Sequence, residues 1–342
     1  KTILYASSLL PDVAENFNDI DDAMRCGFNW QKGPFEILHD IGVSNFLKKL
    51  DPSDNIPSFL KTLNDKKTSL FSIEKNKLHY FNVSRGLVPI TRPEGILSLA
   101  DKKRISEPLY SNDSISLWEF NEQSHFICAE FHTKANALDQ RSAEGLLRAH
   151  DLCKNNFDGI VIANDGMQFS AGVNLNVFLS MALKKEWKEI DSFLNQFQKA
   201  CTQLRYAPFP VIAAPSGLAI GGGYEVVAQT DYVAAHSNCV LGLVEPLVGL
   251  IPAGGGCKEM LRRWSNDAES REDPTYAPIK VFNILGYALT MDSPDKSKEY
   301  KFLAKDDFMV MSRDRLIAEA DKKIALVKEN YTAPKKTIFK LP

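Results

Sequence analysis

Residues 209–235 read FPVIAAPSGLAIGGGYEVVAQTDYVAA, and this stretch decides the class of fold that the sequence predicts. The apolar run at 210–214 is typical of a buried strand, residues 223–230 of a helix and residues 232–235 of another strand. The window 209–228 resembles a membrane span, but it contains two prolines, four glycines and Glu225, which are costly at bilayer depth. The pattern therefore indicates an α/β layered domain.

The same alternation of strands and helices extends from residue 114 to about residue 330. It predicts further strands at 116–120, 126–131 and 159–163. It also predicts helices at 145–154, 179–205, 276–289 and 312–330. The stretch 179–205 has apolar residues at helical spacing throughout, so we expect one long amphipathic helix there.

Residues 1–75 favour helices. Acidic residues in the first turn of 19–24 predict a helix that Gly27 ends, and Gly33-Pro34 begins another that stops at Gly42. A third helical stretch runs through residue 50 before Pro52 breaks it. We therefore divide the chain into a helical domain (1–75), a linker with a hairpin (76–110), an α/β domain (111–330) and a tail (331–342).

Composition narrows the class of protein. The chain has 342 residues, or two domains at about 150 residues each. Its 41 basic and 43 acidic residues leave a net charge of −2, so we expect no nucleic-acid partner.

The six cysteines lie far apart, which predicts reduced, mostly buried thiols in a cytoplasmic protein without a metal site. We expect no signal peptide and no transmembrane segment, and a start at Lys1 suggests a piece of a longer protein.

Three segments of the second half suit chemistry better than packing. They read FSAGVNL at 169–175, AIGGGYE at 219–225 and VEPLVGLIP at 244–252. A glycine-rich turn at a helix start leaves backbone N–H donors unpaired, and two carboxylates, Glu225 and Glu245, could move a proton and activate water. Neither a phosphate-binding P-loop nor a G-x-G-x-x-G fingerprint is present.

Each of these segments also has an ordinary structural interpretation. The glycines at 221–223 could form only a tight turn, and Glu245 could be a solvated loop carboxylate. Asn174 could be a turn-former that bonds its own backbone. The combination of two donor-bearing turns and two carboxylates in one α/β unit favours acid/base chemistry beside a thioester.

The segments, together with FHTKANAL at 131–138 and EPLVGLIPAGGG at 245–256, resemble the crotonase (enoyl-CoA hydratase) superfamily. The resemblance covers about residues 111–330 and implies an α/β fold with a crotonase (ClpP-like) β-β-α superhelical core. It implies that the N–H groups of Val173 and Gly222 bind the thioester oxygen and that Glu225 and Glu245 are catalytic. It further implies coenzyme A or substrate contacts at Lys134, Ala135, Ala137, Ala171 and Asn174.

The first forty residues resemble a different family. DIDDAM at 19–24, KGPFEIL at 32–38 and DIG at 40–42 are similar to the small all-α C-terminal domain of 3-hydroxyacyl-CoA dehydrogenases. This order of domains resembles bifunctional fatty-acid oxidation proteins. The resemblance implies a fragment whose NAD-binding Rossmann domain lies outside this chain, so NAD would bind only there. We expect no covalently bound cofactor, and a homo-oligomer that is a trimer or a dimer.

The resemblance implies hydration of a trans-2-enoyl-CoA to a 3-hydroxyacyl-CoA in fatty-acid β-oxidation. Glu225 would deprotonate the water, and Glu245 would supply the proton at C2. Two residues depart from the family pattern: Asn174 stands where hydratases often have aspartate, and Pro246 stands where many members have an aliphatic residue. We expect Pro246 to hold Glu245 in an extended conformation. The alternatives are an enoyl-CoA isomerase, which keeps one glutamate at the position of Glu245, and a non-catalytic acyl-CoA-binding or assembly module.

Overall fold

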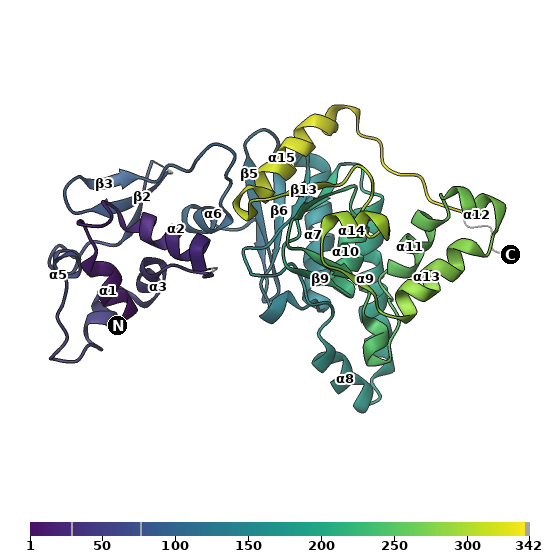
Figure 1. The fold of residues 1–342 in the computed structure, drawn as a ribbon, viewed down its shortest axis with the longest axis horizontal. Coiled ribbons are helices and arrows are strands. Elements are labelled where there is room, and N and C mark those ends of the chain that lie inside the picture. Colours follow the sequence, from purple (N-terminus) through teal and green to yellow (C-terminus); the bar gives the residue numbers. More distant parts are fainter. Residues whose placement is uncertain (29, 76, 339–342) are drawn as a thin grey trace. The chain divides into compact units, whose positions relative to one another are not determined.

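A computed structural model describes residues 1–28, 30–75 and 77–338, so the expected tail is described only as far as residue 338 (Figure 1). The chain divides into two compact units, Lys1–Pro93 and a second unit that begins at Glu94. The boundary lies inside the stretch 76–110 that the sequence assigns to a linker.

The first unit combines helices with a small sheet. The helices are α1 (Thr2–Ser8), α2 (Phe17–Phe28), α3 (Pro34–Ile41), α4 (Val43–Leu47) and α5 (Ser58–Asp65). The strands β1 (Phe71–Glu74), β2 (Lys77–Asn82) and β3 (Gly86–Pro89) pair antiparallel in that order. The hairpin predicted within 76–110 is thus confirmed as β2 and β3, with Arg85-Gly86 where the turn meets β3, and β1 is a strand that the sequence does not predict.

Aromatic packing and one buried carboxylate hold this unit together. The ring of Phe17 lies 5.2 Å from Phe35 and 5.3 Å from Phe71, centroid to centroid. Asp21 accepts hydrogen bonds from the N–H groups of Phe35 and Glu36, so a carboxylate of α2 caps the start of α3. α3 begins after Gly33 and ends at Gly42 as predicted, whereas α2 continues one residue past Gly27.

Within the described residues, the second unit contains a seven-stranded sheet and a smaller sheet. The large sheet has the order β13-β10-β8-β7-β6-β5-β4, parallel from β6 to β13 and antiparallel from β4 to β6. Its strands are β4 (Tyr110–Ser111), β5 (Ile115–Asn121), β6 (His125–Phe131), β7 (Gly159–Ile162), β8 (Val211–Ala213), β10 (Tyr232–His236) and β13 (Phe308–Val310). The small sheet has the order β12-β11-β9, with β9 (Leu218–Ile220), β11 (Val240–Gly242) and β12 (Thr290–Met291).

Helices cover both faces of the large sheet, which explains its nearly continuous apolar strands. α7 (Gln140–Asn156) packs on one face and α15 (Leu316–Val327) on the other. The other helices of the second unit are α6 (Leu99–Ile105), α8 (Leu175–Leu183), α9 (Trp187–Arg205), α10 (Gly222–Ala228), α11 (Gly256–Trp264), α12 (Ala268–Glu272), α13 (Tyr276–Gly286) and α14 (Pro294–Glu299). On β6, Ile127 and Ala129 pack into the core that contains α7 and α9, while Phe126 and Cys128 pack into the core that contains α15. Successive side chains of the strand therefore point to opposite faces of the sheet and pack into two different cores.

The prediction of one continuous helix at 179–205 is wrong. Two helices, α8 and α9, occupy this stretch, and they are separated at Lys185, whose φ is +58°. A left-handed residue cannot continue a right-handed helix, so the chain changes direction there. The spacing of apolar residues on both sides of Lys185 does not indicate that the helix breaks there.

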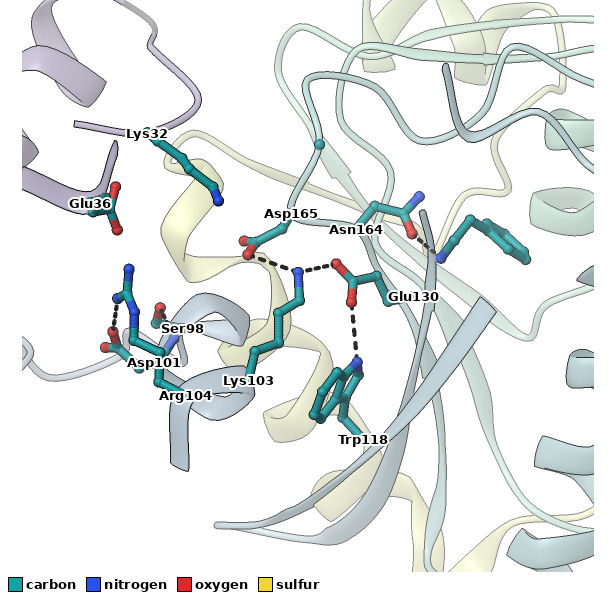
Figure 2. A network of polar contacts seen from close by, with 12 residues as sticks. Lys32, Glu36, Ser98, Asp101, Lys103, Arg104, Trp118, Glu130, Asn164 and Asp165 are labelled. Atoms are coloured by element: carbon teal, nitrogen blue, oxygen red, sulfur yellow. Dashed lines mark hydrogen bonds and ion pairs between the residues drawn. The ribbon is translucent and has the colours of Figure 1, made fainter. Parts of the chain in front are cut away.

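An ionic network around the buried carboxylate of Glu130 joins α6 to the sheet on the face away from α7 (Figure 2). Glu130 of β6 accepts a hydrogen bond from Trp118 Nε1 at 3.1 Å and pairs with Lys103, whose Nζ also lies 3.4 Å from Asp165 Oδ2. Burial raises the pKa of Glu130, and the Lys103 ammonium partly offsets this effect.

No helix in the described part of the chain is long and apolar enough to cross a membrane.

Candidate active site

The three segments that the sequence singled out meet at one cavity in the second unit. The cavity has a volume of about 330 Å³ and is open on one side. Its walls come from the 171–173 turn, α8, α9, the start of α10 and the stretch 244–254. Residues up to 83 positions apart in the sequence line this cavity because β9 is a parallel neighbour of β11 and Ser170 pairs in parallel with Ala219 of β9.

Two backbone N–H groups, those of Val173 and Gly222, have no acceptor among the described residues. Val173 pairs with Leu138 in a short parallel bridge. The two hydrogen bonds of this bridge run from Leu138 N–H to the carbonyl of Gly172 and from Asn174 N–H to the carbonyl of Leu138, so the N–H of Val173 takes no part in it. A Cβ built on Gly222 would lie 3.5 Å from Val173 N, and one built on Gly172 would lie 3.5 Å from Gly222 N. The two donors are thus neighbours, and glycine keeps the space between them open.

Glu225 lies in the first turn of α10 with 2% of its surface exposed. Its Oε1 accepts hydrogen bonds from Gly254 N and Gly256 N, both at 2.8 Å. Glu225 itself lines the cavity. Burial raises the pKa of Glu225, and the N–H groups of residues 254–256 act in the opposite direction because they stabilise the ionised form.

Glu245 has different surroundings on the same cavity. Its Oε1 lies 3.4 Å from the place that a Cβ on Gly221 would take, and its buried Oε2 has no hydrogen-bond partner among the described residues. Burial, followed by the charge of Glu225, raises the pKa of Glu245 to about 7. The two carboxyl groups therefore differ: backbone N–H groups stabilise the ionised form of Glu225, whereas Glu245 is in part protonated near pH 7.

The prediction that Pro246 holds Glu245 in an extended conformation is wrong. Glu245 begins a 3₁₀ turn, Glu245–Val248, with Pro246 at the second position of that turn. Proline has the φ that the first turn of a helix needs and lacks an N–H that would go unpaired there. Pro246 therefore orients Glu245 by starting a turn and does not hold it extended.

The residues implied as coenzyme A contacts lie on two adjoining loops. The carbonyl of Ala135 accepts from Ala171 N at 3.1 Å, which joins the loop of Lys134, Ala135 and Ala137 to the loop of Ala171. Lys134 and Ala135 are exposed, and Ala135 has a left-handed φ of +59°. Asn174 caps α8, because its Oδ1 accepts from Val177 N at 3.4 Å, as the turn-former interpretation expects.

Sequence reasoning missed two features of the site. It did not assign the N–H groups of Gly254 and Gly256 to Glu225, although the run AGGG at 253–256 was a signal for exposed backbone donors. It also missed the aromatic wall of Phe193 and Phe197 on α9, whose spacing is that of any buried helix face. A Cβ on Gly254 would lie 2.3 Å from Phe197, so glycine is needed there for close approach.

The comparisons with known proteins agree with this geometry. The family described as enoyl-CoA hydratase/isomerase matches residues 126–269, which carry both N–H groups and both carboxylates. Residues 126–269 form a crotonase-family domain. An enoyl-CoA hydratase from Bacillus anthracis superposes with a TM-score of 0.51 over 64% of this chain and 81% of its own, at 22% identity. An enoyl-CoA hydratase/carnithine racemase from Magnetospirillum magneticum gives 0.52 over 64% and 77%, at 21% identity. These two structures support the crotonase fold.

Curated relatives of the crotonase-family domain extend the similarity to the first unit. A probable 3-hydroxyacyl-CoA dehydrogenase of Bacillus subtilis is 29% identical over 344 residues, or 100% of this chain and 43% of the relative. A putative fatty acid oxidation complex trifunctional enzyme of Rickettsia felis is 28% identical over 97% of this chain and 43% of the relative. The chain thus spans less than half the length of these relatives. Helices followed by a crotonase-family domain match the order that the sequence resemblance implies.

Proposed function

We propose that the crotonase-family domain hydrates trans-2-enoyl-CoA thioesters to 3-hydroxyacyl-CoA. The observation that carries this proposal is the placement of two unpaired N–H groups and two carboxyl groups of unlike surroundings on one cavity. Such an arrangement can stabilise negative charge on an oxygen while it gives and takes one proton.

Each group has one role in the proposed reaction. The N–H groups of Val173 and Gly222 bind the thioester oxygen and stabilise the enolate-like charge that develops on it. Glu225, which lines the cavity and whose charge is stabilised by backbone N–H groups, takes a proton from water as the water oxygen bonds to C3. Glu245, whose pKa is raised to about 7, gives its proton to C2.

The substrate's coenzyme A moiety would lie along the loops of Lys134, Ala135, Ala137, Ala171 and Asn174. We place the reaction in fatty-acid β-oxidation because the curated relatives carry fatty-acid oxidation and 3-hydroxyacyl-CoA dehydrogenase names. Any NAD-dependent step would use residues outside this chain, and assembly into a trimer or a dimer stays a prediction.

The test is hydration of crotonyl-CoA, followed as loss of enoyl absorbance. We expect turnover by the wild-type chain and a fall of about 10²-fold or more in kcat for Glu225→Gln, since a general base is removed. Glu272→Gln, on the exposed helix α12, is the control and leaves the rate unchanged.

Two results would reject hydration. Binding of crotonyl-CoA without turnover would make the domain an acyl-CoA-binding module. Conversion of a 3-enoyl-CoA to the 2-enoyl isomer, with no hydration and no effect of Glu225→Gln, would make it an isomerase that relies on Glu245.

A further inference from the structure

Ser170 lies between the two turns that carry the unpaired N–H groups, and the proposed reaction does not use it. The residue is fully buried (0% exposed) and does not line the cavity, so it does not touch a substrate bound there. A buried hydroxyl group is costly unless it has a hydrogen-bond partner. The partner that Ser170 has therefore indicates what its hydroxyl group does.

In the first turn, the hydroxyl group of Ser170 binds one of the backbone N–H groups. Its Oγ accepts a hydrogen bond from the N–H of Gly172 at 3.1 Å. The N–H groups of residues 171 and 174 donate to carbonyls of the 135–138 loop. Of the four consecutive N–H groups at 171–174, only that of Val173 is thus without an acceptor in the described part of the chain.

Gly172 makes this turn dependent on the Ser170 hydrogen bond. Its φ of +92° is a conformation that glycine adopts at little cost, and glycine also adopts many others. The peptide group on the N-terminal side of Gly172 is held by Ser170, and its carbonyl is held by the N–H of Leu138 at 2.8 Å. Loss of the Ser170 hydrogen bond would free one of these two sides, and the N–H of Val173 follows directly.

Ser170 also contacts the second turn. A Cβ built on Gly223 would lie 2.6 Å from the Cβ of Ser170 and 2.9 Å from its Oγ, so the backbone of Gly223 packs directly against this side chain. The N–H and the carbonyl of Ser170 bond to Leu218 and Ile220 of β9, at 2.8 and 3.1 Å, which fixes its backbone. Gly222, the donor of the second turn, precedes Gly223. One buried side chain therefore contacts both donor-bearing turns.

We propose that Ser170 is a positioning residue for the two N–H donors: its hydroxyl group holds the 171–173 turn so that the N–H of Val173 lies beside that of Gly222. This inference rests on the proposed hydration, because it concerns the donors of that reaction. Ser170 then acts on the rate more than on binding, since the thioester oxygen carries more negative charge in the transition state than in the bound substrate.

The test compares Ser170→Ala with the wild-type chain in the hydration of crotonyl-CoA. We expect kcat to fall about tenfold, which is less than the loss of about 10²–10³-fold for removal of a whole donor, and KM to change by less than about twofold. The substitution removes one acceptor and keeps the backbone hydrogen bonds of Ser170 to β9.

Infrared spectra of bound butyryl-CoA with an isotope-labelled carbonyl give a second readout, because this thioester has no double bond to hydrate. Hydrogen bonds from the two donors lower the stretching frequency of the carbonyl. At equal occupancy, we expect a smaller lowering of this frequency in Ser170→Ala than in the wild-type chain.

Ser98→Ala is the matched control. The Oγ of Ser98 also accepts a backbone N–H at 3.1 Å, that of Asp101 at the start of α6, and Ser98 does not line the cavity. We expect the midpoint of urea unfolding to fall in both variants, because each loses one side-chain acceptor for a backbone N–H. Ser98→Ala should keep the wild-type kcat and the wild-type carbonyl frequency.

The possible results separate this inference from the proposed function. A Ser170→Ala variant with the kcat and the carbonyl frequency of Ser98→Ala overturns the inference while hydration stands. A rise in KM at unchanged kcat also overturns it, because Ser170 would then support binding alone. If the wild-type chain hydrates no enoyl-CoA, the proposed function is rejected, and the carbonyl frequency of butyryl-CoA then decides whether Ser170 positions the donors.

Discussion

At the residue scale, Glu225 and Glu245 show how surroundings give one side-chain type two roles. Glu225 has an oxygen held by two N–H groups of the 254–256 turn, so its ionised form is stabilised. Glu245 has a buried oxygen without a partner and a carboxylate nearby, so its protonated form is favoured. This division supports Glu225 as the proposed base and Glu245 as the proposed acid.

The raised pKa of Glu245 predicts how activity depends on pH. Because the proposed acid must be protonated, we expect kcat/KM to fall about tenfold per unit above about pH 7 in a pH–rate profile. Glu245→Gln removes most of the activity and this basic limb. A limb of unchanged position in Glu245→Gln, measured on the residual activity, would assign it to another group.

The same pKa predicts an effect on stability. Folding raises the pKa of Glu245 from 4.5 to about 7, so the folded state disfavours its ionised form. Wild-type stability relative to Glu245→Gln is therefore highest below about pH 4.5 and is lost as pH rises through about 7. We expect urea unfolding to find Glu245→Gln more stable by about 1–3 kcal/mol at pH 8.5, and the difference to shrink towards pH 5. Glu272→Gln should show no such trend.

The residue types of the site could be predicted from sequence, but their partners could not. Glu225, Glu245 and the glycine-rich turns stand in short segments whose composition is unusual for a core. The N–H donors to Glu225 come from residues 29 and 31 positions later, and no local pattern links them. Pro246 was misread because the rule for residues before proline is statistical, and a proline that starts a helical turn is its common exception.

At the element scale, the break between α8 and α9 carries a local cost. Lys185 has φ +58°, a conformation that costs a residue with a Cβ about 1–2 kcal/mol and costs glycine almost nothing. We expect Lys185→Gly to raise the free energy of unfolding by about 0.5–1 kcal/mol in a urea titration. Lys184→Gly is the matched control, since Lys184 has φ −82° and gains nothing from glycine. Equal changes in the two variants would contradict the argument.

Helices and strands were predicted best where the spacing of apolar residues agrees with a glycine or proline that marks the end of the element. The hairpin at Arg85-Gly86 and the helix between Gly33 and Gly42 have both, and both are present. The stretch 179–205 has the helical period but no glycine or proline at the break. The sequence there has no end signal, so the left-handed turn at Lys185 is visible only in the structure.

At the scale of the whole molecule, all six cysteines are free thiols, and burial separates them into classes. Cys26 is exposed and Cys257 is half-buried, with burial raising the pKa of the Cys257 thiol to about 11. The other four, Cys128, Cys153, Cys201 and Cys239, are buried, and burial raises their pKa values as well.

Thiol titration with a chromogenic disulfide reagent checks this classification. We expect one fast thiol in the native chain, lost in Cys26→Ser, and one slow thiol, lost in Cys257→Ser, because the thiolate is the reactive form. The remaining four should react only in denaturant. More than two reactive thiols under native conditions would contradict the burial of the two cores.

The sequence by itself determined the alternation of strands and helices in the second unit, the crotonase resemblance and the residue types of the site, because these depend on short-range periodicity and on motifs a few residues long. Only the tertiary structure decided which groups meet. The parallel pairing of β9 with β11 and with Ser170 brings Val173, Gly222, Glu225 and Glu245 to one cavity. The tertiary structure also gave the two carboxyl groups unlike surroundings. Burial and the pairing of distant backbone groups depend on contacts between segments far apart in the chain, and no local pattern encodes them.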